Sequence, residues 1–366
     1  MKATAAVCRA QGEEFRIEEI DLGELRDNEV LVRNVGAGVC HTDLICRDQW
    51  YPVPLPSVFG HEGAGVVEEV GKGVTKLKPG DHVVMTLMSC GSCKSCQIGR
   101  PMYCAELFGR NFSGGRPDGS SVLSGEGGRI NGHFFGQSSF ASYSISYERN
   151  TVKVDPEADL KLLGPLGCGV QTGAGAIFNS FNPNAGTSLA VFGSGSVGLS
   201  AIMAAHAVGC TTIIAVDLKD SRLALAKELG ATHGINPSDG TNVVEAIKDL
   251  TGGGVDFSLE LTAAPKVFRN AVECLAPLGT VGVIGAAALG TEYTFDMNDL
   301  MLPGKTIRGL IEGDSVPDIF IPRLVSLIQQ GKFPLAKLIT NYKLDEINTA
   351  AHDSESGACV KPVLVF

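Results

Sequence analysis

Two sets of metal-ligating residues with different spacings stand out in this 366-residue chain. Four cysteines follow C-x2-C-x2-C-x7-C spacing, so four thiolates from one loop can surround a zinc ion and leave no coordination position for a substrate. Two other cysteines and a His-Glu pair come from distant segments. Two thiolates and one imidazole are typical of a catalytic zinc, whose open fourth position acts as a Lewis acid. The closed set is Cys90, Cys93, Cys96 and Cys104, and the open set is Cys40, His61, Glu62 and Cys168.

Cysteines also serve other purposes, which must be weighed against zinc binding. The chain has eleven cysteines in 366 residues. That cysteine content, about 3%, is far below the roughly 8–10% of disulfide-rich secreted domains, so a disulfide scaffold is disfavoured. Four closely spaced cysteines can instead hold an iron–sulfur cluster or form a redox switch. The remaining cysteines have no comparable neighbours and are expected to be small buried hydrophobic residues: Cys8, Cys46, Cys210, Cys274 and Cys359.

Composition excludes several classes of protein. The formal charge of -10 and the pI near 5.2, with no block of lysine or arginine, would repel nucleic acid and anionic membranes. The N-terminal sequence MKATAAVCRA lacks the apolar core of a signal peptide, and no stretch approaches 18 consecutive apolar residues. We therefore expect a cytoplasmic protein without nucleic-acid or membrane partners, whose length corresponds to about two domains.

The pattern of the chain changes near Thr172. Before that point, short β-branched runs separated by turn sequences such as Lys78-Pro79-Gly80-Asp81 predict a β-rich domain. After it, buried strands alternate with amphipathic helices, which is typical of a doubly wound parallel sheet, so the expected fold class is α/β. Strands are expected over residues 15–20, 29–35, 65–70, 81–85, 188–192, 212–216, 255–259, 280–284 and 306–310, and helices over 197–208, 221–229 and 243–250.

The first strand of the second region runs into a G-x-G-x-x-G motif that opens a helix. This motif, Gly193 to Gly198, lets the backbone approach a pyrophosphate at the positive end of the helix. The next strand ends in Asp217, whose carboxylate can bind the adenosine ribose and repels a 2′-phosphate, so NAD is favoured over NADP. Lys219 and Arg222 leave some use of NADP open. The alternative is a tight strand-helix turn with Asp217 as a helix cap.

With both halves considered, the chain resembles the medium-chain zinc-dependent alcohol dehydrogenases over nearly its whole length, and most of all the aryl-alcohol, or benzyl-alcohol, dehydrogenases. The resemblance lies in the zinc signature Gly60-His61-Glu62-x2-Gly65-x5-Gly71-x2-Val74, the four-cysteine lobe, Leu166-Gly167-Cys168-Gly169 and Cys40-His41-Thr42-Asp43. It implies a GroES-like β-rich catalytic domain with two zinc ions over residues 1–170, and a Rossmann NAD-binding domain over 171–312. Residues 313–366 are implied to return to the first domain, ending in a strand over 361–366.

The resemblance also implies roles around the open zinc site. A zinc ion there would act as a Lewis acid on the alcohol oxygen while hydride leaves for the nicotinamide. Thr42 is expected to accept the alcohol proton, and Asp43 is expected to orient His61 through its other ring nitrogen. Glu62 is either a charge close to the metal or a transient ligand that helps product leave.

Contacts with the cofactor are implied in the same way. His41 and Lys361 match residues that meet the cofactor pyrophosphate, and Thr172 matches a residue that meets the nicotinamide, as does the backbone of the Ile284–Ala286 segment. The full set of expected NAD-binding residues is His41, Thr172, Gly193, Gly195, Val197, Gly198, Asp217, Arg222, Ile284, Ala286 and Lys361.

The chain departs from the family pattern at the end of the proton relay. Many members place a histidine three residues beyond the Thr42 position, whereas this chain has Ile45, which cannot carry a proton. Two routes remain open, namely release from the ribose hydroxyl directly to solvent and transfer through His41.

The expected substrate is a primary alcohol that carries a ring or a conjugated chain. By resemblance, Trp50, Tyr51, Phe134 and Phe135 lie near the substrate cleft, and flat aromatic walls suit such a substrate. Thr86 stands where many relatives have a bulky residue, which would widen the pocket. The alternative is that these aromatic residues form core. Benzylic alcohols are the first choice, and large allylic alcohols such as terpenoids are the second.

Two other functions stay open at this point. A glutathione-dependent formaldehyde dehydrogenase of the same fold would need a cationic pocket for the carboxylates of the thiol. A non-catalytic NAD-sensing or zinc-storage protein would need the glycine motif but not the open ligand set together with it. By resemblance, a self-pairing edge strand in the Rossmann domain implies a homodimer or homotetramer.

Overall fold

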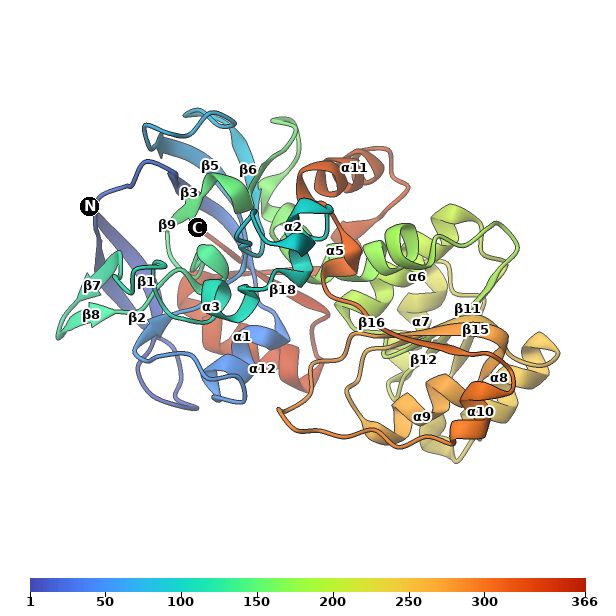
Figure 1. Cartoon of the computed structure of the whole chain (residues 1–366). Coiled ribbons are helices and arrows are strands. Elements are labelled where there is room, and N and C mark those ends of the chain that lie inside the picture. The colour runs from blue at the N-terminus through green and yellow to red at the C-terminus, as the bar shows by residue number, and fades with distance from the viewer. The chain divides into compact units, whose positions relative to one another are not determined.

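The computed structural model describes the whole chain, Met1–Phe366, as two compact units. Unit 1 comprises Met1–Cys168, Ser315–Gly331 and Leu335–Phe366, and unit 2 comprises Gly169–Asp314 with Lys332–Pro334. Unit 1 is rich in antiparallel strands and unit 2 contains a parallel sheet flanked by helices (Figure 1). The α/β class expected from the sequence is therefore confirmed.

Unit 1 is built on two sheets. The smaller has the strand order β4-β1-β2-β7-β8, and the larger has the order β10-β6-β5-β3-β18-β17 with β9 also paired to β3. The last strand, β18, runs antiparallel to β3, so the end of the chain completes a sheet that begins near its start. The strands are β1 Lys2–Cys8, β2 Arg16–Leu22, β3 Glu29–Gly38, β4 Ser57–Val58, β5 Glu62–Val70, β6 His82–Met85, β7 Leu123–Gly125, β8 Gly128–Ile130, β9 Tyr143–Tyr147, β10 Thr151–Lys153, β17 Ile339–Lys343 and β18 Lys361–Val365.

The helices of unit 1 lie around a core that is rich in aromatic rings. Phe59, Phe134 and Phe140 have no exposed surface and belong to one cluster of buried apolar residues. Helix α12 packs against α1 and β18, which couples the C-terminal segment to the residues that follow Cys40. The helices are α1 His41–Arg47, α2 Lys94–Gln97, α3 Leu107–Asn111, α4 Leu160–Leu163, α11 Pro317–Gln329 and α12 Ile347–Ser356.

A buried ion pair joins the start of β3 to the loop that follows α3. Arg116 donates to both carboxylate oxygens of Glu29, at 2.7 Å each, and the two side chains are 7% and 0% exposed. Burial raises the pKa of Glu29, but the nearby His133 ring and the hydrogen bonds from Arg116 outweigh burial and bring that pKa down to about 2. The folded-state pKa of Glu29 lies below the ordinary value of 4.5. The ionised carboxylate therefore stabilises the folded state fully above pH 4.5, and this stabilisation is lost as the pH falls towards 2.

Removing one partner of this pair should destabilise unit 1 strongly. We expect Arg116→Met to lower the free energy of unfolding by about 3–5 kcal/mol at pH 7, because the Glu29 carboxylate is left buried and unpaired. Urea denaturation measures the loss. Arg26→Met is the matched control, since it breaks the exposed pair with Asp118 and should cost less than about 1 kcal/mol. Similar losses of unfolding free energy in both variants would show that burial does not make the Glu29–Arg116 pair more important for stability than an exposed pair.

Unit 2 is a six-stranded parallel sheet with the order β13-β12-β11-β14-β15-β16. The order reverses between β11 and β14, and in such sheets ligands bind at the carboxyl ends of the strands beside this reversal. Helices α8 and α9 share one apolar core with the sheet. The elements are β11 Ser188–Phe192, β12 Thr212–Val216, β13 His233–Ile235, β14 Val255–Glu260, β15 Leu275–Val283, β16 Thr306–Gly309, α5 Gly169–Gly175, α6 Ser196–Val208, α7 Asp220–Glu228, α8 Val243–Thr251, α9 Pro265–Glu273 and α10 Met297–Met301.

Among the strands expected from the sequence, β15 differs most in its bounds. It begins at Leu275 rather than at residue 280, because Leu275 already pairs with Val255 before the register shifts. Leu278, with a φ of 66°, interrupts the regular alternation. A turn residue inside a strand hides the first half of that strand from a pattern-based prediction.

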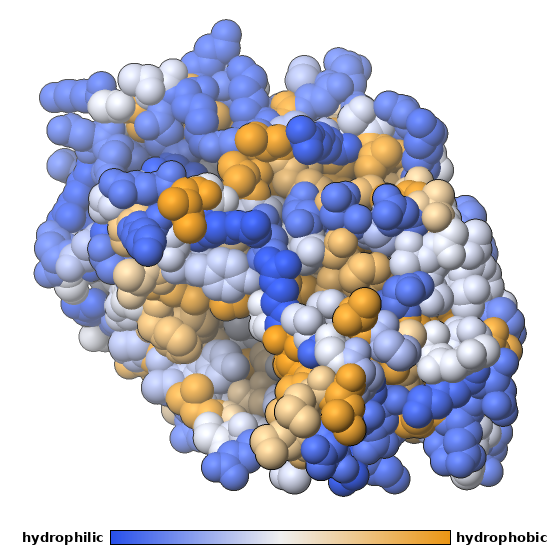
Figure 2. All heavy atoms as spheres, turned by 45° about the vertical axis from the view of Figure 1, so that its right-hand side comes forward, coloured by the Kyte–Doolittle hydropathy of each residue, from blue (hydrophilic) through white to orange (hydrophobic).

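On the face shown in Figure 2, polar side chains are interspersed with patches of apolar ones. None of the helices combines the length and the apolar character that crossing a bilayer requires.

Candidate metal centres and dinucleotide site

The four cysteines of the closed set converge in the loop around α2. Their sulfur atoms all lie within 4.8 Å of one another. Backbone amides point at these sulfurs: the amide of Cys93 donates to Cys90 Sγ at 3.3 Å, and the amide of Cys90 donates to Cys104 Sγ at 3.2 Å. Such donors favour thiolates, and the backbone hydrogen bond from Cys93 leads the effects that lower the pKa of Cys90 to about 6. Four convergent sulfurs with thiolate-stabilising amides fit a structural zinc ion.

The open set also comes together, from three separate segments of unit 1. Cys40 directly precedes α1, His61 and Glu62 lie at the start of β5, and Cys168 ends the turn after α4. One potential ligand atom from each of these four residues lies within 4.8 Å of the others. The turn that carries Cys168 is tied to β6, because the Thr86 hydroxyl donates to the Gly167 carbonyl oxygen at 2.6 Å.

The carboxylate of Asp43 orients His61 and holds the Cys40 turn. One oxygen accepts from His61 Nδ1 at 2.8 Å and from the Gly60 amide at 3.0 Å, while the other accepts from the Cys40 amide at 2.9 Å. Because Nδ1 is the donor, Nε2 is the nitrogen with a free lone pair, and it is buried without any hydrogen-bond partner. A buried nitrogen without a partner, next to two thiols, fits a metal ion with the ligands Cys40, His61 and Cys168.

The charges of the site favour a bound cation. A hydrogen bond from Cys168 lowers the pKa of Cys40 well below its ordinary value, against the opposing effect of burial. Burial lowers the pKa of His61, but the Asp43 carboxylate and the Cys40 thiolate outweigh it, so that pKa stands well above its ordinary value. Zinc must displace the thiol protons and any proton taken up at Nε2, and the negative charges of Asp43 and the thiolates stabilise the cation that takes their place.

Glu62 and Lys361 form a second buried ion pair beside these ligands. Lys361, only 3% exposed, donates to the Glu62 carboxylate at 2.9 and 3.1 Å and to the Val39 carbonyl oxygen at 3.2 Å. Burial raises the pKa of Glu62, and the Lys361 ammonium opposes this. Lys361 is therefore paired with Glu62 in this structure, and its expected contact with the cofactor pyrophosphate stays a prediction. As a transient ligand, Glu62 would first have to leave Lys361.

The residues expected to carry the alcohol proton lie on α1. Thr42 Oγ1 is 3.9 Å from Cys40 Sγ, so this hydroxyl stands beside the predicted metal ligand. Ile45 points into the core and is almost fully buried. His41 is exposed and packs edge-on against Trp50, with 6.5 Å between the ring centres.

The glycine motif of unit 2 links β11 to α6 and has open space where a pyrophosphate would lie. A Cβ at Gly195, the residue before α6, would meet no atom within 4 Å. A Cβ at Gly198 would lie 1.9 Å from the Gly193 carbonyl oxygen, so only glycine fits there. The hydroxyl oxygens of Ser194 and Ser196 are buried without a hydrogen-bond partner. Open space beside a helix N-terminus, together with these hydroxyls, fits a dinucleotide phosphate.

Asp217 stands at the end of β12 beside this motif. Its carboxylate accepts from the Ser194 amide at 2.7 Å and from the Lys219 amide at 2.9 Å, so it is held at the edge of the glycine turn. It does not cap a helix, because α7 begins at Asp220 with Lys219 in the capping position. Arg222 lies buried in the first turn of α7.

The other residues expected at the nicotinamide are also in unit 2. Thr172 is buried on α5, and its hydroxyl lies 3.5 Å from a carboxylate oxygen of Glu312. The Ile284 amide donates to the Glu260 carbonyl oxygen at 3.0 Å, which continues the pairing of β15 with β14. Val197 and Ala286 are half-buried.

The residues expected in the substrate pocket fall into two groups. Trp50 is 50% exposed, and Tyr51 makes edge contacts with Phe108 and Phe112. Phe134 is fully buried and Thr86 is 1% exposed, and a place for either of them at the substrate stays a prediction. The Phe134 ring packs edge-on against His61, with 5.6 Å between ring centres, so it supports the metal ligand directly.

One residue of the site was missed in the sequence. Gln137 donates to the His61 carbonyl oxygen at 2.9 Å and accepts from the Gly63 amide at 3.0 Å. It is 76 residues from His61 and belongs to no ligand spacing, so no local signal could have found it.

Comparisons with known proteins cover both units. A family model for an alcohol dehydrogenase GroES-like domain matches residues 26–156, and one for a zinc-binding dehydrogenase matches residues 196–330. A geraniol dehydrogenase from Castellaniella defragrans is 47% identical over 100% of this chain and 98% of its own length. Two crystal structures cover 100% of this chain, with 99% of each covered. They are an alcohol dehydrogenase zinc-binding domain protein from Burkholderia ambifaria (55% identity, TM-score 0.98) and a benzyl alcohol dehydrogenase from Acinetobacter calcoaceticus (50% identity, TM-score 0.97).

Proposed function

This chain belongs to the zinc-binding alcohol dehydrogenase family, and we propose that it oxidises primary benzylic alcohols to aldehydes, with large allylic alcohols as a second substrate group, and passes the hydride to NAD. The observation that carries the proposal is the buried Nε2 of His61, which has no partner and lies next to two thiols. The substrate class is supported by the benzyl alcohol and geraniol dehydrogenases that the chain resembles at 50% and 47% identity.

The site assigns separate tasks to its residues. Cys40, His61 and Cys168 would hold a zinc ion, which when bound supplies a Lewis acid for the alcohol oxygen. Asp43 fixes the imidazole tautomer and orients the turn before α1. The Thr42 hydroxyl, next to Cys40, accepts the alcohol proton. Ile45 has no group that can continue the relay, so the proton leaves through the ribose hydroxyl or His41.

A substrate panel tests the proposal. We expect kcat/KM with NAD to be higher for benzyl alcohol than for ethanol and for S-hydroxymethylglutathione, because aromatic walls bind a ring better than a short chain or a dicarboxylate. The kcat/KM for geraniol should be closer to that for benzyl alcohol than to that for ethanol. Preference for S-hydroxymethylglutathione would favour a glutathione-dependent formaldehyde dehydrogenase, and no turnover of any alcohol would contradict the proposal altogether.

Asp217 should set the choice between NAD and NADP. The carboxylate is held at the edge of the glycine turn by two backbone amides and would repel a 2′-phosphate. We expect the wild type to favour NAD, and Asp217→Ser to reduce the ratio of kcat/KM for NAD to that for NADP by at least about tenfold, which corresponds to about 1.4 kcal/mol. Equal efficiency of the wild type with both cofactors would show that Lys219 or Arg222 outweighs the carboxylate.

The protein is also proposed to form a homodimer or homotetramer through unit 2. Strand β16 lies at the edge of the sheet. Two exposed apolar side chains lie near it: Leu302, four residues before the strand, is 77% exposed, and Leu278, in the neighbouring strand β15, is 81% exposed. An exposed edge strand with apolar neighbours can pair with a second copy. Light scattering checks the mass, and a monomer at micromolar concentration would overturn this proposal.

A cytoplasmic location is proposed as well. None of the eleven cysteines is in a disulfide, and both sets of metal ligands must stay reduced to bind zinc. Fractionation of cells that express the full chain tests this.

A further inference from the structure

The imidazole of His61 is held at its edge and on its face by different groups. Asp43 accepts from Nδ1 at the edge of the ring at 2.8 Å. The Phe135 ring stacks on the imidazole, with 4.5 Å between ring centres and 30° between planes. One hydrogen bond defines the direction of Nδ1 but leaves the ring free to tilt, because the terminal torsion of histidine is broad. Contact over the face of the ring removes that freedom.

Phe135 reaches this position from an unusual backbone turn. His133, Phe135 and Ser138 all have a positive φ, between 51° and 55°, which is uncommon for residues with a side chain and is costly for a bulky one. Gly136, at a φ of 66°, lies between them. Residues are kept in such conformations only where the surrounding structure holds them, and strain of this kind gathers at functional sites.

Several hydrogen bonds hold the turn in place. The buried Asn150 side chain donates to the Phe135 carbonyl oxygen at 3.1 Å. The Ser138 hydroxyl donates to the Val58 carbonyl oxygen at 2.7 Å, and the Phe134 amide donates to the same hydroxyl at 3.0 Å. The turn is therefore fixed to β4 through Val58 and to Asn150, the residue before β10, and it is closed by a hydrogen bond of its own.

The same turn also holds the backbone of His61. Gln137 donates to the His61 carbonyl oxygen and accepts from the Gly63 amide, so one side chain spans the start of β5. Two neighbours of Gln137 in the chain, Phe134 and Phe135, contact the His61 ring. Residues 133–138 thus contact both the backbone and the ring of His61, one of the predicted metal ligands.

We propose that Phe135 is a positioning residue for the open metal centre: its ring fixes the plane of the His61 imidazole, aims Nε2 at the metal and slows loss of the metal. The inference rests on the proposed function only in taking Cys40, His61 and Cys168 as the ligands of the metal. It does not depend on which alcohol is oxidised. Groups that orient metal ligands typically change metal affinity by roughly 10–100-fold, and a packing contact belongs at the lower end.

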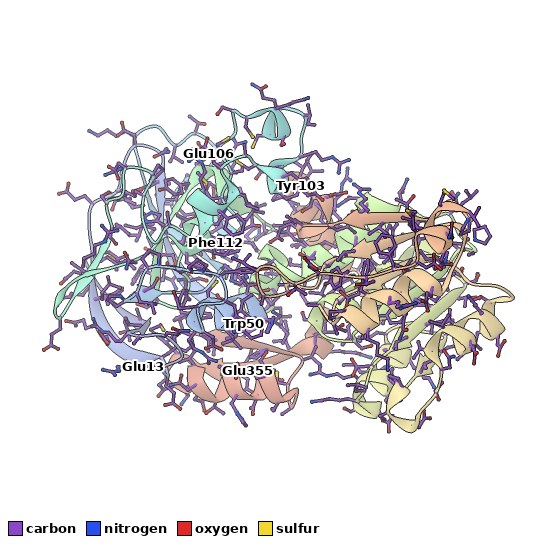
Figure 3. All side chains as sticks on the ribbon, turned by 60° about the horizontal axis from the view of Figure 1, so that its bottom comes forward. Glu13, Trp50, Tyr103, Glu106, Phe112 and Glu355 are labelled. Atoms are coloured by element: carbon purple, nitrogen blue, oxygen red, sulfur yellow. The ribbon has the colours of Figure 1, made fainter.

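The test compares two substitutions of the same kind within one aromatic cluster. Phe135→Leu removes the ring that stacks on His61. Phe112→Leu is the matched control, because Phe112 packs against Phe134 and Phe135 but lies one ring further from His61. Phe112 follows α3 on the surface side of the cluster and is labelled in Figure 3. Phe135→Tyr keeps the ring and serves as the conservative variant.

Two measurements read the metal centre without any alcohol. The first is the rate at which the zinc-loaded full-length protein loses its more labile zinc ion to a chelator, followed with a zinc-sensitive dye. The second is the visible spectrum after cobalt replaces that ion, since the spectrum reports the geometry of the ligands. We expect Phe135→Leu to lose zinc about tenfold faster and to shift the cobalt spectrum. Phe112→Leu and Phe135→Tyr should behave like the wild type.

The outcomes separate positioning from general loss of packing. Wild-type release and spectrum in Phe135→Leu, or equal acceleration in Phe112→Leu, would overturn the proposal. If Phe135→Leu does not fold, Phe135→Met, which fills a similar volume without a ring, is measured in its place and interpreted in the same way. A protein whose zinc release depends on Phe135 but which oxidises no alcohol would contradict the proposed function and leave this inference standing. Normal alcohol oxidation, together with zinc release that substitution of Phe135 does not change, would support the proposed function and overturn the inference about Phe135.

Discussion

Cys168→Ala should leave a folded protein that binds one zinc ion per chain instead of two and oxidises benzyl alcohol at least roughly 1,000-fold more slowly in kcat/KM. Cys168 supplies one of the two thiols next to the free Nε2 of His61. Two remaining ligands hold zinc poorly, and loss of the metal removes the Lewis acid that polarises the alcohol oxygen. Elemental analysis and initial rates with NAD measure the two effects.

The closed set provides the control for this substitution. Cys93→Ala removes a ligand from the four-cysteine loop, where metal binding and folding are coupled. It should therefore impair folding or assembly, whereas Cys168→Ala should retain the wild-type circular dichroism spectrum. Full activity in Cys168→Ala, or iron in place of zinc in the wild type, would contradict the assignment of the two centres.

Thr42→Val should lower kcat/KM for benzyl alcohol by about 100- to 10,000-fold, the range typical of a lost group for proton transfer. Valine has nearly the shape of threonine, so the zinc content should not change. The Thr42 hydroxyl stands beside Cys40, while Ile45 on the same helix is apolar and buried. The loss should persist in an Ile45→His background, because a histidine further along the relay cannot replace the group that touches the alcohol. Near-normal activity in Thr42→Val would show that the proton takes another route.

Much of the site could be predicted because its chemistry leaves a local trace in the chain. Four cysteines in one loop have a spacing that zinc requires, and the structure brings their sulfurs within 4.8 Å of one another. Strands β11 and β12 have the expected bounds, since each is a short, mostly apolar and buried run that ends at a turn residue, Gly193 or Asp217. The Asp43–His61 hydrogen bond followed from the need of a histidine ligand for a partner at its second nitrogen.

The rest depends on tertiary contacts that have no local trace. Lys361 is drawn to Glu62 across 299 residues of sequence, because two buried charges are stable only as a pair. The sequence is compatible with Phe134 as a pocket residue or as a core residue, and its packing against Phe59 and His61 is visible only in three dimensions. Neither Gln137 nor Phe135 is a metal-ligand residue type, so their part in holding His61 appears only in three dimensions.

The fate of a deuterium label tests the central claim most directly. Benzyl alcohol in which both carbinol hydrogens are deuterium is oxidised by the zinc-loaded protein in the presence of NAD, and the reduced cofactor is analysed by mass spectrometry and NMR. If the alcohol passes hydride directly to the nicotinamide, one deuterium per turnover should be found at C4 of the nicotinamide ring, and none should enter the solvent. Reduced cofactor without label, or oxidation of the alcohol without reduction of NAD, would contradict a direct hydride transfer and with it the function proposed for this protein.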